Sequence, residues 1–344
     1  MTQKTISQNL ETPFFIVGSP RSGTTLLQIL IDAHPNIIIP PESHIFGRFS
    51  DIFDYYGDLK KDSNLYLFVK DILQDLSIKE WGLEISVIDF CSQLKITSVK
   101  GVISLLFELS AKKVGKNRWG DKTPQNTFYL KEIHKLFPEA KFIHLIRDGR
   151  DVTESLKRVF IGPKSIYGIA HRWRKYILTF DEFKKTINSD QFLEIHYEDL
   201  VLDLENQVKK IFDFLEEDAE TVNSSNIPET ERRMFYYKSD PLFDSLNKPI
   251  SNQKIGIFRK KLTKREIEIF ESIAGDGLKI YGYQLETSGK TEIGIHEKII
   301  FFYEDNIFRY LRKLFVPLLR KQINYEVQLK IRKISMLIRN KIRT

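Results

Sequence analysis

The segment GSPRSGTTLL, from Gly18 to Leu27, has the composition and spacing of an anion-binding loop. The apolar run Phe14–Val17 precedes it, and the apolar helical pattern of Thr24–Ala33 follows it. A buried strand that ends in a glycine-containing loop and leads into a helix directs backbone N–H groups and the helix N-terminus at one point. The sequence therefore predicts that this loop binds a phosphate or a sulfate.

The loop lacks the lysine that nucleoside-triphosphate loops carry. Gly18 and Gly23 have the spacing of that motif, but Thr24 stands at the lysine position. A β- or γ-phosphate would lose its usual partner there, whereas Arg21 offers a planar, permanently charged fork for one terminal oxyanion. An isolated glycine pair at this spacing is also typical of a structural turn. The order of strand, arginine, threonine pair and apolar helix favours an anion site.

A second charged turn follows a second apolar run. The run Lys141–Ile146 leads into Arg147–Asp151, and Ser155 lies on the predicted helix beyond. Neighbouring parallel strands end at one edge of a sheet, so the two turns would form two adjacent anion cradles. A nucleotide that carries phosphate at both its 5′ and 3′ positions needs both cradles, whereas ATP and GTP need one. Without the first loop, the sequence Arg147–Arg150 would indicate only a common charged turn with a structural role.

The blocks FIVGSPRSGTTLL and LIRDGRDVTESL resemble the two phosphate-binding motifs of sulfotransferases that use 3′-phosphoadenosine-5′-phosphosulfate (PAPS). The tyrosylprotein and bacterial branch is the one they resemble most, and the resemblance extends over residues 14–283. It implies PAPS as donor and adenosine-3′,5′-bisphosphate as product. It also implies two sets of ligands: Ser22, Gly23, Thr24 and Thr25 for the 5′-phosphate, and Arg147 and Ser155 for the 3′-phosphate.

Two later segments resemble further parts of the donor site. In HYEDLV, Tyr197 follows the predicted strand Phe192–His196 and matches a family tyrosine that approaches the adenine, although a strand-end tyrosine is also common in packing. The segment SNQKIGIFRKKL, from Ser251, resembles the loop that closes over the 3′-phosphate. It lacks the Arg-Lys-Gly of cytosolic members, so either Ser251 or Lys254 is the expected ligand contact.

Sulfuryl transfer resembles phosphoryl transfer, an in-line displacement in which the protein positions the partners and neutralises charge. A base must take the proton of the acceptor, and cations must stabilise the sulfuryl and leaving oxygens. The sulfuryl group carries less negative charge than a phosphoryl group, and the seven histidines include no pair at HExxH spacing. We therefore expect no metal requirement.

The candidate base is Glu42 in IIPPESHIF, because tyrosylprotein sulfotransferases have a glutamate at the matching place after Ala-His-Pro. His44 is the alternative, since cytosolic members use a histidine and its ordinary pKa suits base catalysis. Glu42 could also be a solvated loop carboxylate. For the cations, Arg21 would face the sulfuryl oxygens, and Lys122 in WGDKTP resembles a family lysine near the leaving oxygen.

The elements that position these residues are predicted from apolar runs. Buried strands are expected at four segments and, more weakly, at a fifth: Phe14–Val17, Ile37–Ile39, Lys141–Ile146, Phe192–His196 and 117–120. Long helical stretches, among them 65–76 and 99–114, separate them. Strands that alternate with helices predict an α/β fold with a P-loop-like parallel sheet and a helical C-terminal extension. The polar segment 216–253 contains three prolines and is the expected loop over the site.

We predict that the chain of 344 residues consists of a catalytic domain, 1–290, and a basic amphipathic helical extension, 291–344. The first residues lack the apolar core of a signal peptide, and no run is long enough to span a membrane. Cys91 is the single cysteine, so no intrachain disulfide can form. These features predict a cytoplasmic protein.

The positive charge is concentrated at the C-terminus. Residues 309–344 contain eleven Lys or Arg and one acid, Glu326, a net charge of +10 against +7 for the whole chain. Apolar residues alternate with these charges at helical spacing, and Pro317 would separate two helices. The tail could pack on the body or on a second subunit, or lie on an anionic membrane surface; nucleic-acid binding has no motif behind it.

The motifs leave two other functions open. An ATP-dependent small-molecule kinase could share this fold, but it would need the missing loop lysine. An inactive nucleotide-binding scaffold is the other, and the presence of Glu42, Arg21 and Lys122 argues against it. The acceptor, a hydroxyl or an amine, is not identified by the motifs, because they are shared across acceptors.

Overall fold

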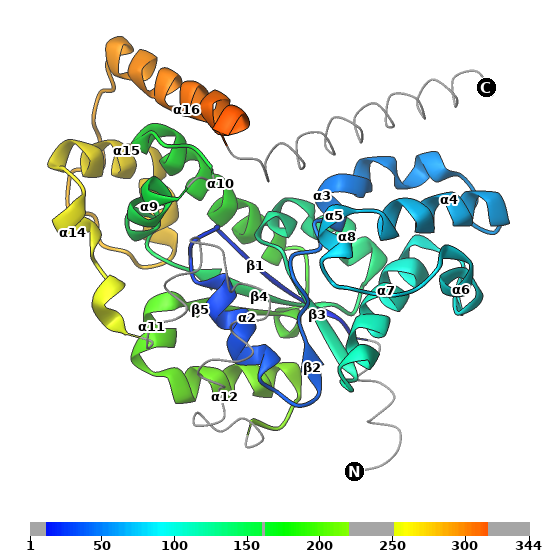
Figure 1. The fold of residues 1–344 in the computed structure, drawn as a ribbon. Helices are drawn as coiled ribbons and strands as arrows, with labels where there is room; N and C mark the ends of the chain where they lie inside the picture. The colour runs from blue at the N-terminus through cyan, green and yellow to red at the C-terminus, as the bar shows by residue number, and fades with distance from the viewer. Residues whose placement is uncertain (1–11, 160–161, 220–250, 316–344) are drawn as a thin grey trace.

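A computed structural model describes residues 12–159, 162–219 and 251–315 of the chain (Figure 1). Its centre is a five-stranded sheet with the order β2-β3-β1-β4-β5, in which every neighbouring pair is parallel. The strands are β1 (Phe14–Gly18), β2 (Ile37–Ile38), β3 (Arg118–Lys122), β4 (Lys141–Ile146) and β5 (Phe192–His196). The predicted parallel α/β fold is confirmed.

The α-helices connect and cover the strands. They are α2 (Thr24–Asp32), α3 (Ile45–Phe49), α4 (Asp62–Leu73), α5 (Leu76–Lys79), α6 (Val87–Ser92), α7 (Val99–Lys113), α8 (Leu130–Leu136), α9 (Gly149–Arg158), α10 (Ile166–Lys184), α11 (Tyr197–Leu202), α12 (Leu204–Leu215), α14 (Phe258–Lys261), α15 (Lys264–Ile280) and α16 (Ile295–Phe315). Short 3₁₀ turns occupy Ser50–Tyr56, Pro124–Tyr129, Ser189–Gln191 and Asn252–Lys254.

Side chains of β1 alternate between two hydrophobic clusters, as the pleat of a strand requires. Phe14 and Ile16 pack with α2 and α12 on one face of the sheet. Phe15 and Val17 pack on the other face with the cluster that α4, α7, α8 and the end of α10 complete. Because both faces of the central strand are buried, the run reads as continuously apolar, which is what made it predictable.

Two predicted boundaries are wrong. The helix expected over 65–76 is two helices, because the side chain of Asp75 accepts a hydrogen bond from the Ser77 amide at 2.8 Å and starts α5. The weak fifth strand does not end at Gly120 but continues to Lys122. Its last two residues are charged, so the apolar pattern missed them.

A third cluster joins α9, α10, α14 and α15 beside the second charged turn. Arg150 of that turn is buried and pairs with Asp148 at 2.7 Å and with Glu271 of α15 at 2.5 Å. Its guanidinium also lies 4.1 Å from the centre of the Phe258 ring. Arg150 therefore fastens α15 to the turn, which leaves Arg147 as the arginine of the turn that faces the first loop.

Helix α16 packs beside α10 at the edge of the molecule, and its described end is Phe315 (Figure 1). Pro317 and most of the predicted loop 216–253 lie outside the described residues. No helix in the described ranges has the length and apolar character to cross a membrane. The division into 1–290 and 291–344 stays a prediction.

Gly149, the first residue of α9, has no room for a side chain. A Cβ there would be 2.5 Å from both the Trp173 and Phe270 rings. We expect Gly149→Ala to lower the free energy of unfolding by about 1–3 kcal/mol, because buried rings must shift. Urea unfolding measures the change.

The matched control is Gly275→Ala in α15, where a Cβ would be 3.8 Å from Leu285, an ordinary contact. There the helix propensity of alanine should leave stability unchanged or raise it by up to about 1 kcal/mol. Equal effects of the two substitutions would contradict the described packing around α9.

Candidate active site

The first loop approaches its neighbours so closely that two positions must be glycine. Gly18 has φ 145°, and a Cβ there would collide with the carbonyl oxygen of Leu145 on β4. Gly23 has φ 100°, and its Cβ would be 2.6 Å from the Tyr197 ring. Between them Arg21 adopts a positive φ of 72°. The loop therefore folds back tightly over the ends of β4 and β5.

This loop presents hydrogen-bond donors that no described residue satisfies. The Ser22 hydroxyl is buried and has no partner within the described ranges. Gly23 is the N-cap of α2, so no side chain caps the first amides of that helix. Unsatisfied buried donors at a helix N-terminus are the arrangement that an anion stabilises. The loop fits the predicted 5′-phosphate site.

Arg147 stands at the end of β4 and joins three segments. Its Nη2 donates to the carbonyl oxygen of Lys254 at 2.8 Å, and its Nη1 lies 3.4 Å from the carbonyl oxygen of Arg21. Its guanidinium carbon lies 4.2 Å from the centre of the Tyr197 ring. Its Nε is buried and, among the described residues, has no acceptor. This Nε is therefore a donor that an oxyanion could satisfy.

Arg21 and Ser155 lie together, which joins the two predicted cradles. The Arg21 Nε donates to the Ser155 hydroxyl at 3.1 Å, across 134 positions of sequence. The sequence assigned Arg21 to the sulfuryl oxygens and Ser155 to the 3′-phosphate. The observed contact places Arg21 on the Ser155 side of the site; its role at the sulfuryl group stays a prediction.

Ser251 and Lys254 begin the segment that lies over Arg147. Of the two, Lys254 contacts Arg147, through its carbonyl oxygen, whereas the Ser251 side chain is exposed. The segment is held by Asp151, whose carboxylate accepts from the Gly256 amide at 2.7 Å and the Phe258 amide at 2.9 Å. Burial raises the pKa of Asp151 to about 6. Sequence reasoning treated Asp151 only as part of a charged turn.

Glu42 and Lys122 form an ion pair at the centre of the site. The Lys122 Nζ lies 2.5 Å from a Glu42 oxygen and 3.4 Å from the Thr25 hydroxyl. The other Glu42 oxygen lies 3.5 Å from Nε2 of His44. The Lys122 side chain is fully buried, whereas those of Glu42 and His44 are 29% and 23% exposed. The predicted cation and both candidate bases are therefore adjacent.

The pKa values of both candidate bases lie below their ordinary values. Burial would raise the pKa of Glu42, but the neighbouring Lys122 and His44 lower it overall. Burial lowers the pKa of His44, and the nearby Glu42 offsets only part of that effect. At neutral pH Glu42 is therefore a carboxylate and His44 a neutral imidazole, so each is in its proton-accepting form.

Asp121 supports this group, and the sequence analysis missed it. Its buried carboxylate accepts hydrogen bonds from the Ser43 hydroxyl at 2.7 Å, the Thr123 hydroxyl at 2.8 Å and the Asn126 amide at 2.9 Å. Burial raises its pKa, and the three donors oppose that rise. Ser43 follows Glu42 directly, so Asp121 fixes the loop that carries the candidate base. In the sequence, the one indication of this role was the position of Asp121 directly before Lys122 in WGDKTP.

Metal ligands are not grouped in the ranges that the structure describes: no three of His, Cys, Asp and Glu are placed to share an ion. The donors at the site are hydroxyls, backbone amides, arginines and a lysine. This set suits an anion.

Comparison with known proteins agrees with this geometry. Residues 13–221 match the sulfotransferase family. The chain belongs to that family. It is 29% identical over 220 residues to a protein-tyrosine sulfotransferase of Drosophila melanogaster, covering 62% of this chain and 40% of the fly protein. A second relative, the nodulation protein NoeE of Sinorhizobium fredii, is 23% identical over 313 residues, covering 83% of this chain and 69% of NoeE.

The solved sulfotransferase domain of the Synechococcus PCC 7002 olefin synthase has the same fold, with a TM-score of 0.52 and 23% identity. The superposition covers 80% of this chain and 96% of that domain. Against the first curated relatives the chain spans about half of their length, between 40% and 56%. The predicted family and fold are confirmed.

Asp121→Asn tests the support of the base-carrying loop. We expect a loss of about 1–3 kcal/mol in the free energy of unfolding, because an amide nitrogen replaces an acceptor of buried donors. Among folded molecules, kcat should also fall while the KM for the donor changes little. Urea unfolding and steady-state kinetics on the same preparation measure the two effects.

Asp71→Asn is the control, since Asp71 is equally buried and accepts from Tyr56 at 2.8 Å, outside the site. It should lose stability without losing kcat. An equal fall of kcat in both variants would show that Asp121 acts only on stability.

Proposed function

We propose that the protein transfers a sulfuryl group from PAPS to a hydroxyl of an acceptor. The observation that carries this proposal is the meeting of two anion cradles at Arg147. Within the described ranges, the Ser22 hydroxyl of one cradle and the Arg147 Nε of the other are both buried and unsatisfied. Two such cradles at the ends of the adjacent strands β1 and β4 fit a nucleotide with two separate phosphates.

The donor would be held by the residues already described. Ser22, Gly23, Thr24 and Thr25 would bind the 5′-phosphate through hydroxyls and backbone amides. Arg147 and Ser155 would bind the 3′-phosphate, and Tyr197, whose ring packs against Arg147 and Gly23, would face the adenine. The segment that begins at Ser251 and Lys254 would cover the 3′-phosphate. Bound PAPS supplies the transferable sulfuryl group, and its 5′-phosphate is the leaving group.

Glu42 would take the proton of the acceptor hydroxyl. Its carboxylate is ionised at neutral pH and partly exposed, so an acceptor could reach it. Lys122 beside it supplies the positive charge that the sulfuryl and leaving oxygens need, and Arg21 supplies a second. Lys122 also weakens Glu42 as a base while the two are paired. Anionic oxygens that attract Lys122 would therefore strengthen the base.

The acceptor is proposed only as a class. The relatives in fly, nematode and zebrafish are named for transfer to protein tyrosine, and a phenolic hydroxyl would suit a carboxylate base. The helical region around 47–116 would contribute to acceptor choice, and the expected second region, 219–248, lies almost wholly outside the described residues. The kinase alternative is not favoured, because Thr24 occupies the position of the loop lysine.

Donor identity is tested by thermal unfolding with adenosine-3′,5′-bisphosphate and, in parallel, with ATP and magnesium. A ligand at about 100 times its dissociation constant should add roughly 2.7 kcal/mol, a shift of several degrees in Tm. We expect the bisphosphate alone to give this shift and Arg147→Ala to abolish it.

Arg158→Ala is the matched control, because Arg158 is a 62% exposed arginine of α9 that pairs with Glu154 of the same helix. It should keep the full shift. Stabilisation by ATP with magnesium and not by the bisphosphate would contradict the proposal and support the kinase.

The pH profile of kcat/KM distinguishes the two candidate bases. With Glu42 as base, protonation of the base should remove activity only as pH falls through a pKa below its ordinary 4.5. His44→Asn should retain activity and move the acid limb to higher pH, because His44 helps to lower the pKa of Glu42.

Glu42→Gln should lower kcat by about 10²- to 10⁴-fold, the usual contribution of a positioned base. The opposite pattern, in which His44→Asn abolishes activity and Glu42→Gln is tolerated, would assign the proton transfer to His44.

A further inference from the structure

Helix α16 faces the protein with its polar side. Asp305 accepts hydrogen bonds from the backbone amides of Lys164 and Ser165 at 2.7 and 2.8 Å, and from the Ser165 hydroxyl at 2.7 Å. These groups lie at the N-terminus of α10, where a negative charge is favourable. A Cβ at Gly168 would collide with the Asp305 carboxylate, so α10 is shaped to admit it.

A second carboxylate fixes the start of the helix. Glu297 accepts from the Arg265 guanidinium of α15 at 2.8 and 2.9 Å, and from the Gly294 amide at 2.9 Å. Phe301, one turn further, stacks on Tyr167 of α10 with ring centres 5.9 Å apart. Two carboxylates, Asp305 and Glu297, and the stacked ring of Phe301 therefore determine which side of α16 meets α10 and α15.

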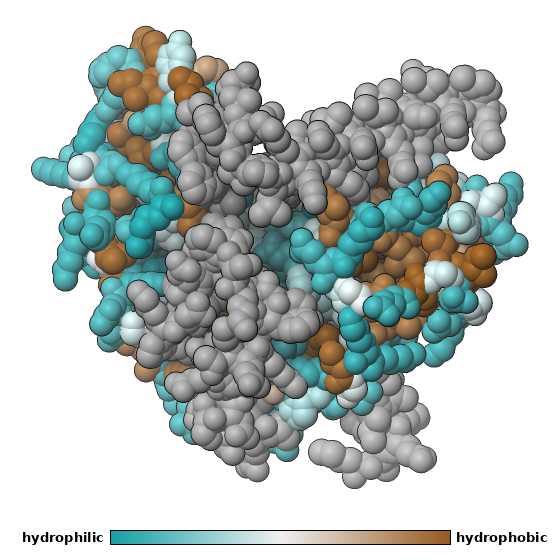
Figure 2. Space-filling view, viewed as in Figure 1, coloured by the Kyte–Doolittle hydropathy of each residue, from teal (hydrophilic) through white to brown (hydrophobic). Residues whose placement is uncertain are grey.

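The outward face of α16 is apolar. Of the thirteen large apolar side chains that are exposed in the described ranges, six lie on this helix: Ile295 (78%), Ile299 (52%), Ile300 (52%), Phe302 (65%), Tyr303 (56%) and Ile307 (51%). Four of them recur at intervals of four residues, so they form one stripe. The hydrophobic side chains over α16 are visible at the upper left of Figure 2. This arrangement is the inverse of an ordinary surface helix.

Charge decides what such a face can meet. The segment 309–344, which follows the stripe in the sequence, has a net charge of +10. Two copies of the chain would bring two such segments together, which like-charge repulsion opposes. An anionic lipid surface attracts each Lys or Arg by about 1 kcal/mol and receives aliphatic and aromatic side chains in its interface. Nucleic acid would match the charge but not the isoleucines.

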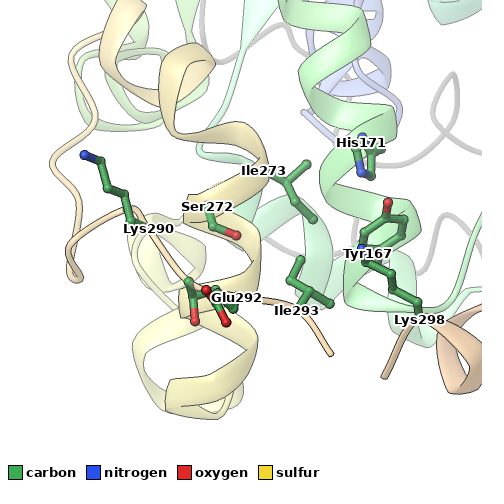
Figure 3. A pocket seen from close by; sticks show the side chains of 10 residues that line it. Tyr167, His171, Ser272, Ile273, Lys290, Glu292, Ile293 and Lys298 are labelled. Atoms are coloured by element: carbon green, nitrogen blue, oxygen red, sulfur yellow. The ribbon is translucent and has the colours of Figure 1, made fainter. Parts of the chain in front are cut away.

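Two lysines, Lys298 on α16 and Lys290 on the segment before it, lie at the edge of a hollow beside the helix. Lys290 and Lys298 line a hollow of about 700 Å³ between α10, α15 and the start of α16, together with His171 and Tyr167 (Figure 3). One acid, Glu292, also lines it. Of these, Lys298 is on the same helix as the apolar stripe.

We propose that the outward face of α16, defined by the six side chains above, binds the surface of an anionic lipid bilayer. The apolar stripe would enter the interface between headgroups and acyl chains, and Lys298 and the Lys and Arg residues that follow in the sequence would contact lipid phosphates. The protein would thus be held at a membrane surface through this face of α16.

Sedimentation of the full-length protein with lipid vesicles tests the proposal. We expect binding to vesicles of phosphatidylcholine with about a third phosphatidylserine, weak binding to phosphatidylcholine alone, and weaker binding at about 0.5 M salt. Ile299→Gln combined with Phe302→Gln should lower the partition coefficient for the anionic vesicles at least about tenfold, because two apolar side chains no longer leave water.

The control carries the same kinds of change elsewhere: Ile88→Gln combined with Leu202→Gln, at side chains that are 70% and 63% exposed. It should bind as the wild type does, and all three proteins should unfold at the same temperature. The proposal is overturned if the wild type does not bind anionic vesicles, or if the α16 variant binds them equally well. A dimer in equilibrium sedimentation that the α16 variant dissociates would instead identify the face as a contact between two copies.

Discussion

The structure depends on the parallel pairing of β1 with two strands from distant parts of the chain. Phe14 of β1 is opposite Gly120 of β3 on one side and Lys141 of β4 on the other. Because all these strands run in the same direction, their carboxyl ends lie at one edge, and the loops that follow must meet there. The loop after β1, Lys122 and Arg147 become neighbours for this reason. The contacts of Lys122 with Thr25 and of Arg147 with Arg21 depend on that register.

The site is assembled from buried charges that a protein selected only for stability would avoid. Lys122 is fully buried, Arg147 keeps a buried Nε without an acceptor among the described residues, and Asp121 gathers three donors inside the sheet edge. Arg150, in the same turn as Arg147, is instead matched by Asp148 and Glu271. The difference marks where the molecule leaves electrostatic capacity for a ligand.

The C-terminal helix shows how an amphipathic pattern can be oriented in two ways. From sequence, the mixture of apolar and charged residues was compatible with packing on the body, with a second subunit or with a membrane. Asp305 and Glu297 resolve the orientation, since both carboxylates bind the body and turn Ile299 and Phe302 outward. Periodicity identified the helix, but only its contacts show which face is left over.

The sequence by itself determined the parallel α/β fold, four of the five strands and the places of the two glycine-containing turns that we propose bind phosphate, because glycine spacing and apolar runs act over a few residues. It could not determine that Lys122 pairs with Glu42, that Arg21 meets Ser155, or that Asp121 holds the base-carrying loop. These partners are separated by about 80 residues or more, and only the order of strands in the sheet brings them together. The tertiary structure decided them because a charged strand end has no apolar pattern, and its partners exist only after the strands have paired.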